Sequence, residues 1–274
     1  MPYLATPHTL LYYDIFAPDI TAPTIQQTNQ PEQAFQTVLL IHGFAGTPTN
    51  DFAALIPQLC THYSVLAPHL HGYGYSSHRS HYSITYYRED AADLVALLDA
   101  LHLSQVLVLG FSDGAIVALL LAALYPARVA ALAILGAQAS INAHDVAGIR
   151  HWLLDTPLSE QWQAQLAQLH GDPYWRSLPQ MYVEVQEEFV AAGGVLISDE
   201  ELARIRCPTL IMHGTRDRIV PVEYARILHE RIPRSQLLLF DAGHAAHLKH
   251  ERQFTEVIMN FFQESKIDTE KRSS

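Results

Sequence analysis

A serine and an aspartate interrupt an apolar stretch in the middle of the sequence. Residues 106–126 read VLVLGFSDGAIVALLLAALYP, with Ser112 at the centre of Gly-Phe-Ser-Asp-Gly. A serine between two such glycines, after a strand and before a helix, is typical of a strained turn that exposes a nucleophilic hydroxyl. A side chain at Gly110 or Gly114 would collide with neighbouring backbone in such a turn. The alternative is an ordinary strand–helix turn with a capping serine or aspartate.

Two further residues could supply the base and the acid that a serine nucleophile needs near neutral pH. His244 follows the apolar run QLLLFDAG, and Asp217 follows the run PTLIMHG. Both runs are expected to be strands of one parallel sheet, and ligands of such sheets bind at the carboxyl ends of the strands. We therefore predict that Ser112, His244 and Asp217 together catalyse acyl transfer.

Other residues compete for the roles of acid and base. Asp145 lies well inside a different segment, and Asp241 stands three residues before His244, where it is expected to cap a turn. His247 is an alternative base, but a glycine directly before His244 favours presentation of that ring by a loop. The sequence favours Asp217 as the acid and assigns His247 to lining or supporting the loop.

The elements that must position these residues alternate between strands and helices. Runs rich in Val, Leu and Ile predict strands buried on both faces, at residues 37–43, 63–70, 105–111, 129–137, 208–214 and 236–243. Helical spacing joins Phe52, Leu55, Ile56 and Leu59, then Ala91, Leu94, Leu98 and Leu101, and later Phe254, Ile258 and Phe261. This alternation predicts an α/β fold with a mostly parallel, doubly wound sheet. Residues 10–17 predict an antiparallel edge strand.

Composition bounds the class of protein. The 274 residues are 49% hydrophobic, which suits a large core. Their formal net charge of −11 argues against nucleic acid or an anionic membrane as partner. Cys60 and Cys207 form no disulfide framework. The N-terminus shows no signal peptide, and Pro126 and Arg128 divide the most apolar segment into pieces too short for a membrane span. We expect a soluble, cytoplasmic protein.

Histidines are numerous enough to raise the question of a metal site. His69 and His71 would share one face of a strand, and His78 and His81 follow closely. No carboxylate-rich companion or typical metal-ligand spacing accompanies them. We therefore expect neither a metal nor a cofactor.

The chain resembles the α/β-hydrolase fold superfamily over residues 37–262. LLIHGFAGT resembles the family's His-Gly turn, and PHLHGYGYS resembles its Asp-x-Arg-Gly-x-Gly-x-Ser turn, with His69 and His71 in place of the usual charged pair. The resemblance implies that the backbone N–H groups of Phe44 and Asp113 form an oxyanion hole. The order of serine, aspartate and histidine is also that of the family.

One region breaks the alternation of strands and helices. Residues 138–206 carry no convincing strand, but they hold Gln-rich helical patterns and all three tryptophans. In the family that the chain resembles, such an insertion is a helical cap over the pocket. The expected parts are an α/β-hydrolase core of residues 1–137 and 207–265, a helical cap of residues 138–206 and a flexible tail of residues 266–274.

Asp113 needs an explanation, because a carboxylate beside the nucleophile opposes the negative charge of the transition state. Its side chain either turns onto the first turn of the following helix or pairs with a positive group on the substrate. Gly-Phe-Ser-Asp-Gly resembles the Gly-Trp-Ser-Asp-Gly of valacyclovir-hydrolase-like α-amino-acid ester hydrolases. In that family the aspartate after the serine is thought to hold the ammonium group of the substrate. Both alternatives remain open.

The most direct interpretation is a cofactor-free serine hydrolase that cleaves small carboxylic esters through an acyl-enzyme. Candidate substrate-binding residues are Asp113, Phe111, Trp152, Trp175 and Met181. The aromatic residues of the insertion would equally suit its own small core. Alternatives are a C–C bond or amide hydrolase with the same triad, and a fold member used for binding or signalling. The oligomeric state is left open.

Overall fold

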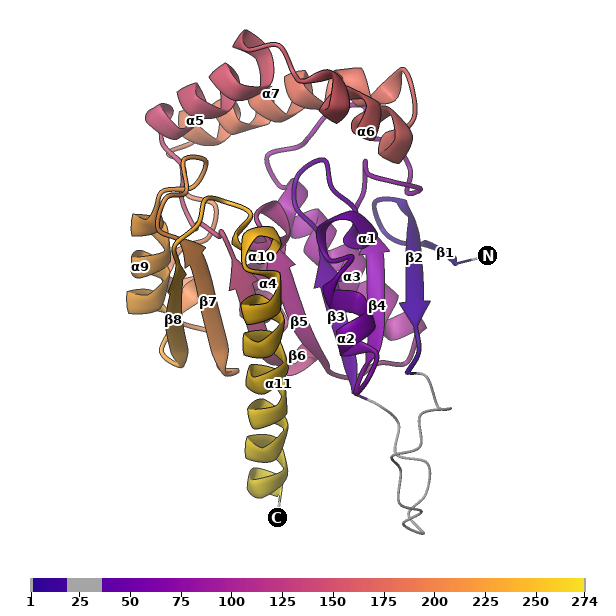
Figure 1. The fold of residues 1–274 in the computed structure, drawn as a ribbon, viewed down its shortest axis with the longest axis vertical. Coiled ribbons are helices and arrows are strands. Elements are labelled where there is room, and N and C mark those ends of the chain that lie inside the picture. Colours follow the sequence, from indigo (N-terminus) through magenta and orange to yellow (C-terminus); the bar gives the residue numbers. More distant parts are fainter. Residues whose placement is uncertain (1, 19–35, 274) are drawn as a thin grey trace.

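The computed structural model describes residues 2–18 and 36–273. Within these residues one mixed sheet has the strand order β1-β2-β4-β3-β5-β6-β7-β8 (Figure 1). The strands β3 to β8 run parallel to one another, whereas β1 and β2 are antiparallel to their neighbours. The bounds are β1 (Tyr3–Ala5), β2 (Leu10–Phe16), β3 (Thr37–Ile41), β4 (Ser64–His69), β5 (Val106–Phe111), β6 (Val129–Leu135), β7 (Thr209–Gly214) and β8 (Ser235–Phe240).

The predicted mostly parallel sheet is confirmed, with one difference at its edge. Each of the six apolar runs forms one of the strands β3 to β8. The run at residues 10–17 forms the antiparallel strand β2, but β1 pairs along its outer side. β2 is therefore second from the edge. The three residues of β1 are too few to show the alternation by which a strand is recognised.

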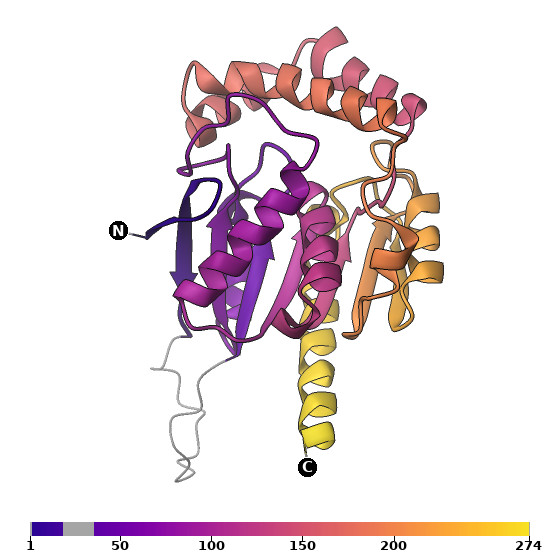
Figure 2. The same ribbon diagram turned by 180° about the vertical axis from the view of Figure 1, so that it is seen from behind.

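Helices cover both faces of the sheet (Figures 1 and 2). One face carries α3 (Tyr86–Ala100), α4 (Asp113–Leu124) and α9 (Val222–Arg231), and the other carries α2 (Leu55–Leu59) and α11 (Glu251–Ser273). In β3, Leu39 and Ile41 pack into the first core cluster, whereas Val38 and Leu40 pack into the second. This alternation with period two explains why the strand is apolar throughout.

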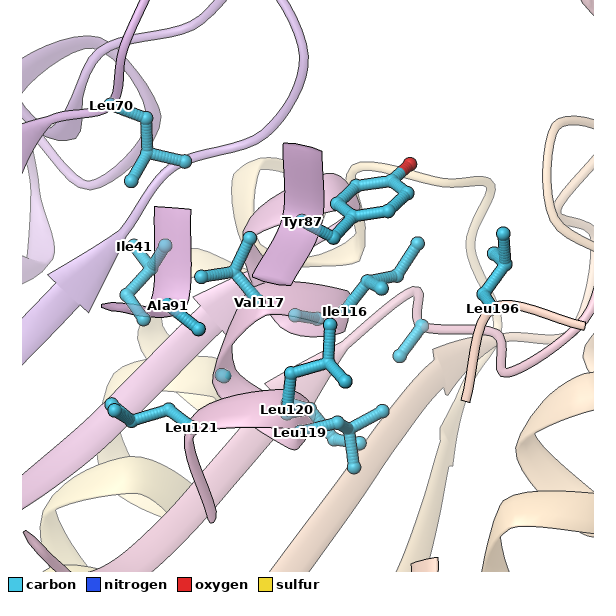
Figure 3. Packing of buried hydrophobic residues seen from close by; sticks show 14 of the residues in the cluster. Ile41, Leu70, Tyr87, Ala91, Ile116, Val117, Leu119, Leu120, Leu121 and Leu196 are labelled. Carbon is cyan, nitrogen blue, oxygen red and sulfur yellow. The ribbon is translucent and has the colours of Figure 1, made fainter. Parts of the chain in front are cut away.

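The apolar segment after Ser112 is the central helix α4. Figure 3 shows Ile116 of this helix near Tyr87 of α3 and Val117 near Ala91 of α3, all in one hydrophobic cluster. A helix that is hydrophobic on all sides belongs inside a core or a membrane. None of the helices in the described part of the chain is both long and apolar enough to cross a membrane.

The segment between β6 and β7 is helical. Three of its helices form a layer beyond the carboxyl ends of the strands, and we call residues 138–206 the cap (Figures 1 and 2). The two connections of the cap meet where the N–H of Ile141 donates to the carbonyl of Gly194 at 2.8 Å. Its helices are α5 (Ala143–Arg150), a π-helical turn (His151–Asp155), α6 (Glu160–His170), a 3-10 turn (Tyr174–Ser177), α7 (Leu178–Ala191) and α8 (Asp199–Leu202).

The remaining elements are short or terminal. α1 (Pro48–Asp51) follows β3, and α10 (Ala246–Lys249) precedes α11. α11 continues to Ser273, through most of the segment for which the sequence predicts a flexible tail. Residue 274 lies outside the described residues.

Candidate active site

Ser112 occupies a strained turn between β5 and α4. Its φ of 54° and ψ of −121° lie in a region that residues other than glycine seldom adopt. A Cβ atom at Gly110 would lie 2.5 Å from the carbonyl oxygen of Gly114. One at Gly114 would lie 2.3 Å from the carbonyl oxygens of Ile41 and His42. The predicted collisions at both glycines are therefore confirmed, and they explain why glycine stands on each side of the turn.

Ser112, His244 and Asp217 form a continuous chain of hydrogen bonds. The Ser112 Oγ lies 2.8 Å from His244 Nε2, and His244 Nδ1 lies 2.6 Å from Asp217 Oδ2. An ionised carboxylate can only accept, so the Nδ1–H of His244 donates to Asp217. The lone pair of His244 Nε2 then faces the hydroxyl of Ser112. The structure thus brings together three residues that are far apart in the sequence.

Asp217 is held in its ionised form by several donors. Its Oδ1 accepts the N–H groups of Ile219 at 2.9 Å and Val220 at 3.0 Å. His213 Nε2 donates to the carbonyl oxygen of Val220 at 2.8 Å and also lies 3.3 Å from Asp217 Oδ2. Burial opposes ionisation, but hydrogen bonds from His213 and His244 hold the pKa of Asp217 well below its usual range. His213, four residues before Asp217, is a supporting residue that the sequence analysis missed.

The competing acids and base have other partners. Asp241 is exposed and pairs with Arg216 at 2.9 Å instead of capping a turn. Asp145 forms a capping box at the start of α5. His247 is buried, with its ring centroid 4.4 Å from that of Phe111. None of them occupies the position opposite His244 Nδ1, which belongs to Asp217.

Two backbone N–H groups beside Ser112 are available to donate hydrogen bonds to a ligand. Phe44 and Asp113 line the same pocket as Ser112. Within residues 2–18 and 36–273, neither N–H donates a hydrogen bond to another group of the chain. Donors of this kind stabilise an oxyanion when they are aimed at the position where the charge develops.

The pocket at Ser112 has a volume of about 350 Å³ and lies between the core and the cap. Its polar residues include Asp51, Asp113 and Gln138, and no lysine or arginine is among the described residues that line it. Most of its surface is apolar, from residues that include Phe44, Phe111, Ile149, Trp152, Trp162 and Leu248. Such a surface suits a small, largely uncharged acyl or aryl group.

The predicted substrate-binding residues divide between the pocket and the core of the cap. Phe111, Trp152 and Asp113 line the pocket. Trp175 and Met181 do not, contrary to expectation, because both pack into the hydrophobic cluster that joins the cap to the core. The sequence could not separate these two fates, since apolar side chains serve both. It also did not select Trp162, which stacks on Trp152 with ring centroids 5.2 Å apart.

The carboxylate of Asp113 is bound by three tyrosine hydroxyls. Its Oδ1 accepts from Tyr87 at 3.0 Å and Tyr182 at 2.8 Å, and its Oδ2 accepts from Tyr86 at 3.2 Å. It does not fold onto the first turn of α4, which was one of the two predicted alternatives. Burial raises the pKa of Asp113 to about 6, although the three hydroxyls favour the ionised form. Tyr86 and Tyr87 come from α3, and Tyr182 comes from α7.

The histidines considered as metal ligands are dispersed. His69 Nε2 lies 3.9 Å from Asp14, and the ring of His78 stacks on Tyr174 with centroids 3.7 Å apart. In the part of the chain that the structure describes, no three histidine, cysteine or acidic side chains are placed to hold a metal ion together.

Comparisons with known proteins point to one family. A sequence model of the alpha/beta hydrolase fold matches residues 36–176 and 158–251. The chain is 31% identical to the human (Homo sapiens) serine hydrolase BPHL over 247 residues, which cover 87% of this chain and 82% of that protein. It is 28% identical to 2-hydroxy-6-oxo-2,4-heptadienoate hydrolase of Pseudomonas putida, covering 82% of this chain and 88% of that one.

A solved structure has the same fold at low sequence identity. The 2-hydroxy-6-oxo-6-phenylhexa-2,4-dienoate hydrolase of a Rhodococcus species superimposes with a TM-score of 0.78 at 19% identity. The alignment covers 96% of this chain and 98% of that one. At this identity the likeness concerns the fold alone.

Proposed function

The chain belongs to the alpha/beta hydrolase fold family, and from this premise we propose that it is a serine hydrolase of small carboxylic esters. The observation that carries the proposal is the unbroken chain of hydrogen bonds from Ser112 through His244 to Asp217 beside an apolar pocket. The alternatives that share this chain differ in the bond that is cleaved, and the charge of the pocket bears on one of them, the C–C cleavage of an anionic substrate.

In the first half-reaction Ser112 Oγ attacks the ester carbonyl carbon while its proton passes to His244 Nε2. The carbonyl oxygen becomes an oxyanion, which the N–H groups of Phe44 and Asp113 bind. The C–O bond to the alcohol then breaks, and His244 returns the proton to the leaving oxygen. Asp217 stabilises the imidazolium that exists between these two proton transfers. The product is an acyl ester of Ser112.

In the second half-reaction water replaces the alcohol. His244 takes a proton from the water as its oxygen attacks the acyl carbonyl, and the same two N–H groups bind the new oxyanion. The bond between the acyl carbon and Ser112 Oγ breaks, and the proton returns to the serine. The carboxylic acid leaves, and the chain of hydrogen bonds is restored.

The charge of the pocket favours a neutral or cationic substrate over an anionic one. Burial raises the pKa of both Asp51 and Asp113 to about 6, so both are mainly ionised above that pH. Two like charges 4 Å apart repel by about 4 kcal/mol at an effective dielectric constant of 20. The heptadienoate named for the Pseudomonas putida relative is a carboxylate, and this pocket offers it no cationic side chain among the described lining residues. We therefore favour ester cleavage over C–C cleavage of such an acid.

Esters of α-amino acids are the cationic class that the motif Gly-Phe-Ser-Asp-Gly suggests. A carboxylate has about four acceptor sites, and tyrosine hydroxyls fill three of those of Asp113. One site remains for an ammonium group. This second candidate substrate class uses the same three catalytic residues, so the two classes differ only in the group that Asp113 meets.

The test compares kcat/KM for three matched esters, one neutral, one with an α-ammonium group and one with a distal carboxylate. Ser112→Ala serves as the blank and Asp113→Asn as the test of charge. We expect turnover of the neutral ester and poor turnover of the anionic one. A preference for the ammonium ester that Asp113→Asn removes would identify amino-acid esters as the substrates. Turnover of a dienoate ring-cleavage product without ester turnover would contradict the proposal.

A further inference from the structure

We infer that His170 of the cap is a positioning residue of the oxyanion loop, so that catalysis depends on contact between the cap and this loop. We use "oxyanion loop" for residues 42–46, which connect β3 to α1 and include Phe44. The inference rests on the proposed function, since the loop matters to catalysis only if Phe44 binds an oxyanion.

His170 joins three separate segments of the chain. It is the last residue of α6, and only 2% of its surface is exposed. Its Nε2 lies 3.0 Å from the carbonyl oxygen of Ala45, and its Nδ1 lies 2.9 Å from the backbone nitrogen of Gly74. One buried side chain thus connects the cap to the oxyanion loop and to the loop after β4.

The partners of His170 determine its tautomer. A backbone N–H can only donate, so Nδ1 of His170 must accept from Gly74. A carbonyl can only accept, so Nε2 must carry the proton that is donated to Ala45. Burial, the largest effect, lowers the pKa of His170, in agreement with this neutral form. The ring therefore acts as a fixed donor and acceptor pair.

The contact with Ala45 falls where the oxyanion loop is strained. Ala45 has a φ of 56°, in the left-handed region that few residues other than glycine adopt. Such a conformation persists only where the surroundings impose it. The bond from His170 fixes the carbonyl of Ala45, directly after Phe44. It thereby opposes relaxation of the loop.

The other side of Phe44 is fixed from within the core. The Nδ1–H of His42 donates to the carbonyl of Gly43 at 2.8 Å, and the N–H of Gly43 donates to Asp51 at 2.9 Å. The carbonyl of Gly43 belongs to the same planar peptide as the N–H of Phe44, so fixing one fixes the direction of the other. The core holds this peptide from one side, and His170 holds the next residue from the cap.

The effect of losing His170 follows from the geometry of oxyanion binding. Removing one oxyanion donor outright lowers kcat by about 10²–10³-fold. His170→Ala would misplace the N–H of Phe44 without removing it, so we expect kcat to fall by roughly 10–100-fold. KM should change by less than about threefold, because the side chain of His170 is not among the residues that line the pocket.

The test measures kcat and KM for a neutral ester in the wild type, His170→Ala, His170→Gln and His151→Ala. The glutamine amide can accept from Gly74 and donate to Ala45, so it should restore most of kcat. His151 is an exposed histidine of the cap whose ring contacts Thr156, and His151→Ala should leave kcat unchanged. If His170→Ala does not fold, as judged by thermal unfolding, His170→Leu replaces it, because leucine fills the site without either hydrogen bond.

Inhibition by a boronic acid is a second measurement, and it distinguishes misplacement of the Phe44 N–H group from a general loosening of the structure. A boronic acid forms a tetrahedral anion on Ser112 Oγ while the serine proton passes to His244. We expect its inhibition constant to rise in His170→Ala by about the factor that kcat/KM falls. Wild-type kcat and inhibition in His170→Ala, or equal losses in the alanine and glutamine variants, would overturn the inference. Absence of Ser112-dependent turnover in the wild type would instead overturn the proposed function.

Discussion

Tyr182→Phe should destabilise the protein by an amount that depends on the ionisation of Asp113. The change removes the hydroxyl that donates to Asp113 Oδ1 at 2.8 Å and leaves the ring in place. Both residues are 7% exposed, so water does not replace the lost donor easily. A hydrogen bond to a charged group contributes about 1.5–3 kcal/mol to stability, and one between neutral groups contributes about 0.5–1.5 kcal/mol. The loss should therefore be about twice as large when Asp113 is ionised.

The direction of the pH effect follows from the raised pKa of Asp113. The folded protein holds the Asp113 proton up to about pH 6, whereas the unfolded chain releases it near the ordinary value of 3.8. Stability from this group therefore falls as pH rises through the window between these values and is constant above it. Removing the hydroxyl of Tyr182 raises the folded pKa further, which widens the window. The destabilisation should be about 1 kcal/mol at pH 5 and about 2–3 kcal/mol at pH 8.

Urea unfolding of the wild type and the variant at both pH values measures this difference directly, provided that the slope m is unchanged. The matched control is Tyr82→Phe, which removes a buried hydroxyl that bonds to the neutral hydroxyl of Tyr73 at 2.6 Å. Its cost should be similar at pH 5 and pH 8. The same destabilisation of Tyr182→Phe at both values would refute the assignment of a buried, titrating carboxylate at Asp113.

Three further outcomes are expected. Gly114→Ala should abolish folding or destabilise the protein by more than about 4 kcal/mol, because its Cβ would lie 2.3 Å from backbone oxygens. Gly148→Ala, whose Cβ would have no atom within 4 Å, should raise the free energy of unfolding by about 0.5–1 kcal/mol. Equal thermal stabilities of the two variants would contradict the packing at the turn. Asp217→Asn should lower kcat roughly 10⁴-fold with an unchanged circular dichroism spectrum, and a loss below tenfold would remove its orienting role. Trp152→Leu should raise KM for aromatic esters several-fold with little change in Tm, whereas Trp175→Leu should lower Tm instead. The reverse pattern would contradict the assignment of Trp152 to the pocket and of Trp175 to the core.

The order of elements could be predicted because local pattern and tertiary environment agree. The parallel strands are buried on both faces, as β3 illustrates, and therefore appear in the sequence as continuous apolar runs. Ser112, Asp217 and His244 each follow such a run, so their meeting at one edge of the sheet followed from topology. Strand β1 escaped prediction because its three residues carry no periodicity.

The environment of Asp113 could not be predicted, because its partners are distant in sequence. Tyr86 and Tyr87 lie in a helix before it, and Tyr182 lies in the cap. Nothing in the spacing of these tyrosines indicates that their hydroxyls converge on one carboxylate. The role of His170 could not be predicted for the same reason. Its two partners are backbone groups, which every residue type carries, so the sequence does not indicate them.

Which aromatic residues line the pocket could not be predicted for a different reason. Trp152 and Trp162 line the pocket, whereas Trp175 is 5% exposed and packs in the core. Burial of an aromatic ring stabilises the cap in either place, so composition alone carries no preference. Only the packing of α5, α6 and α7 decides which rings face Ser112.

The central claim is that Ser112 carries the acyl group, and trapping of the intermediate tests it most directly. The protein is mixed with a neutral activated ester, quenched in acid within the first turnover, digested and analysed by mass spectrometry. The account predicts a mass increase of one acyl group on the peptide that contains Ser112, and turnover in Ser112→Ala reduced by roughly 10⁴-fold or more. Ester turnover that persists in Ser112→Ala, or an acyl group found on another residue, would contradict it.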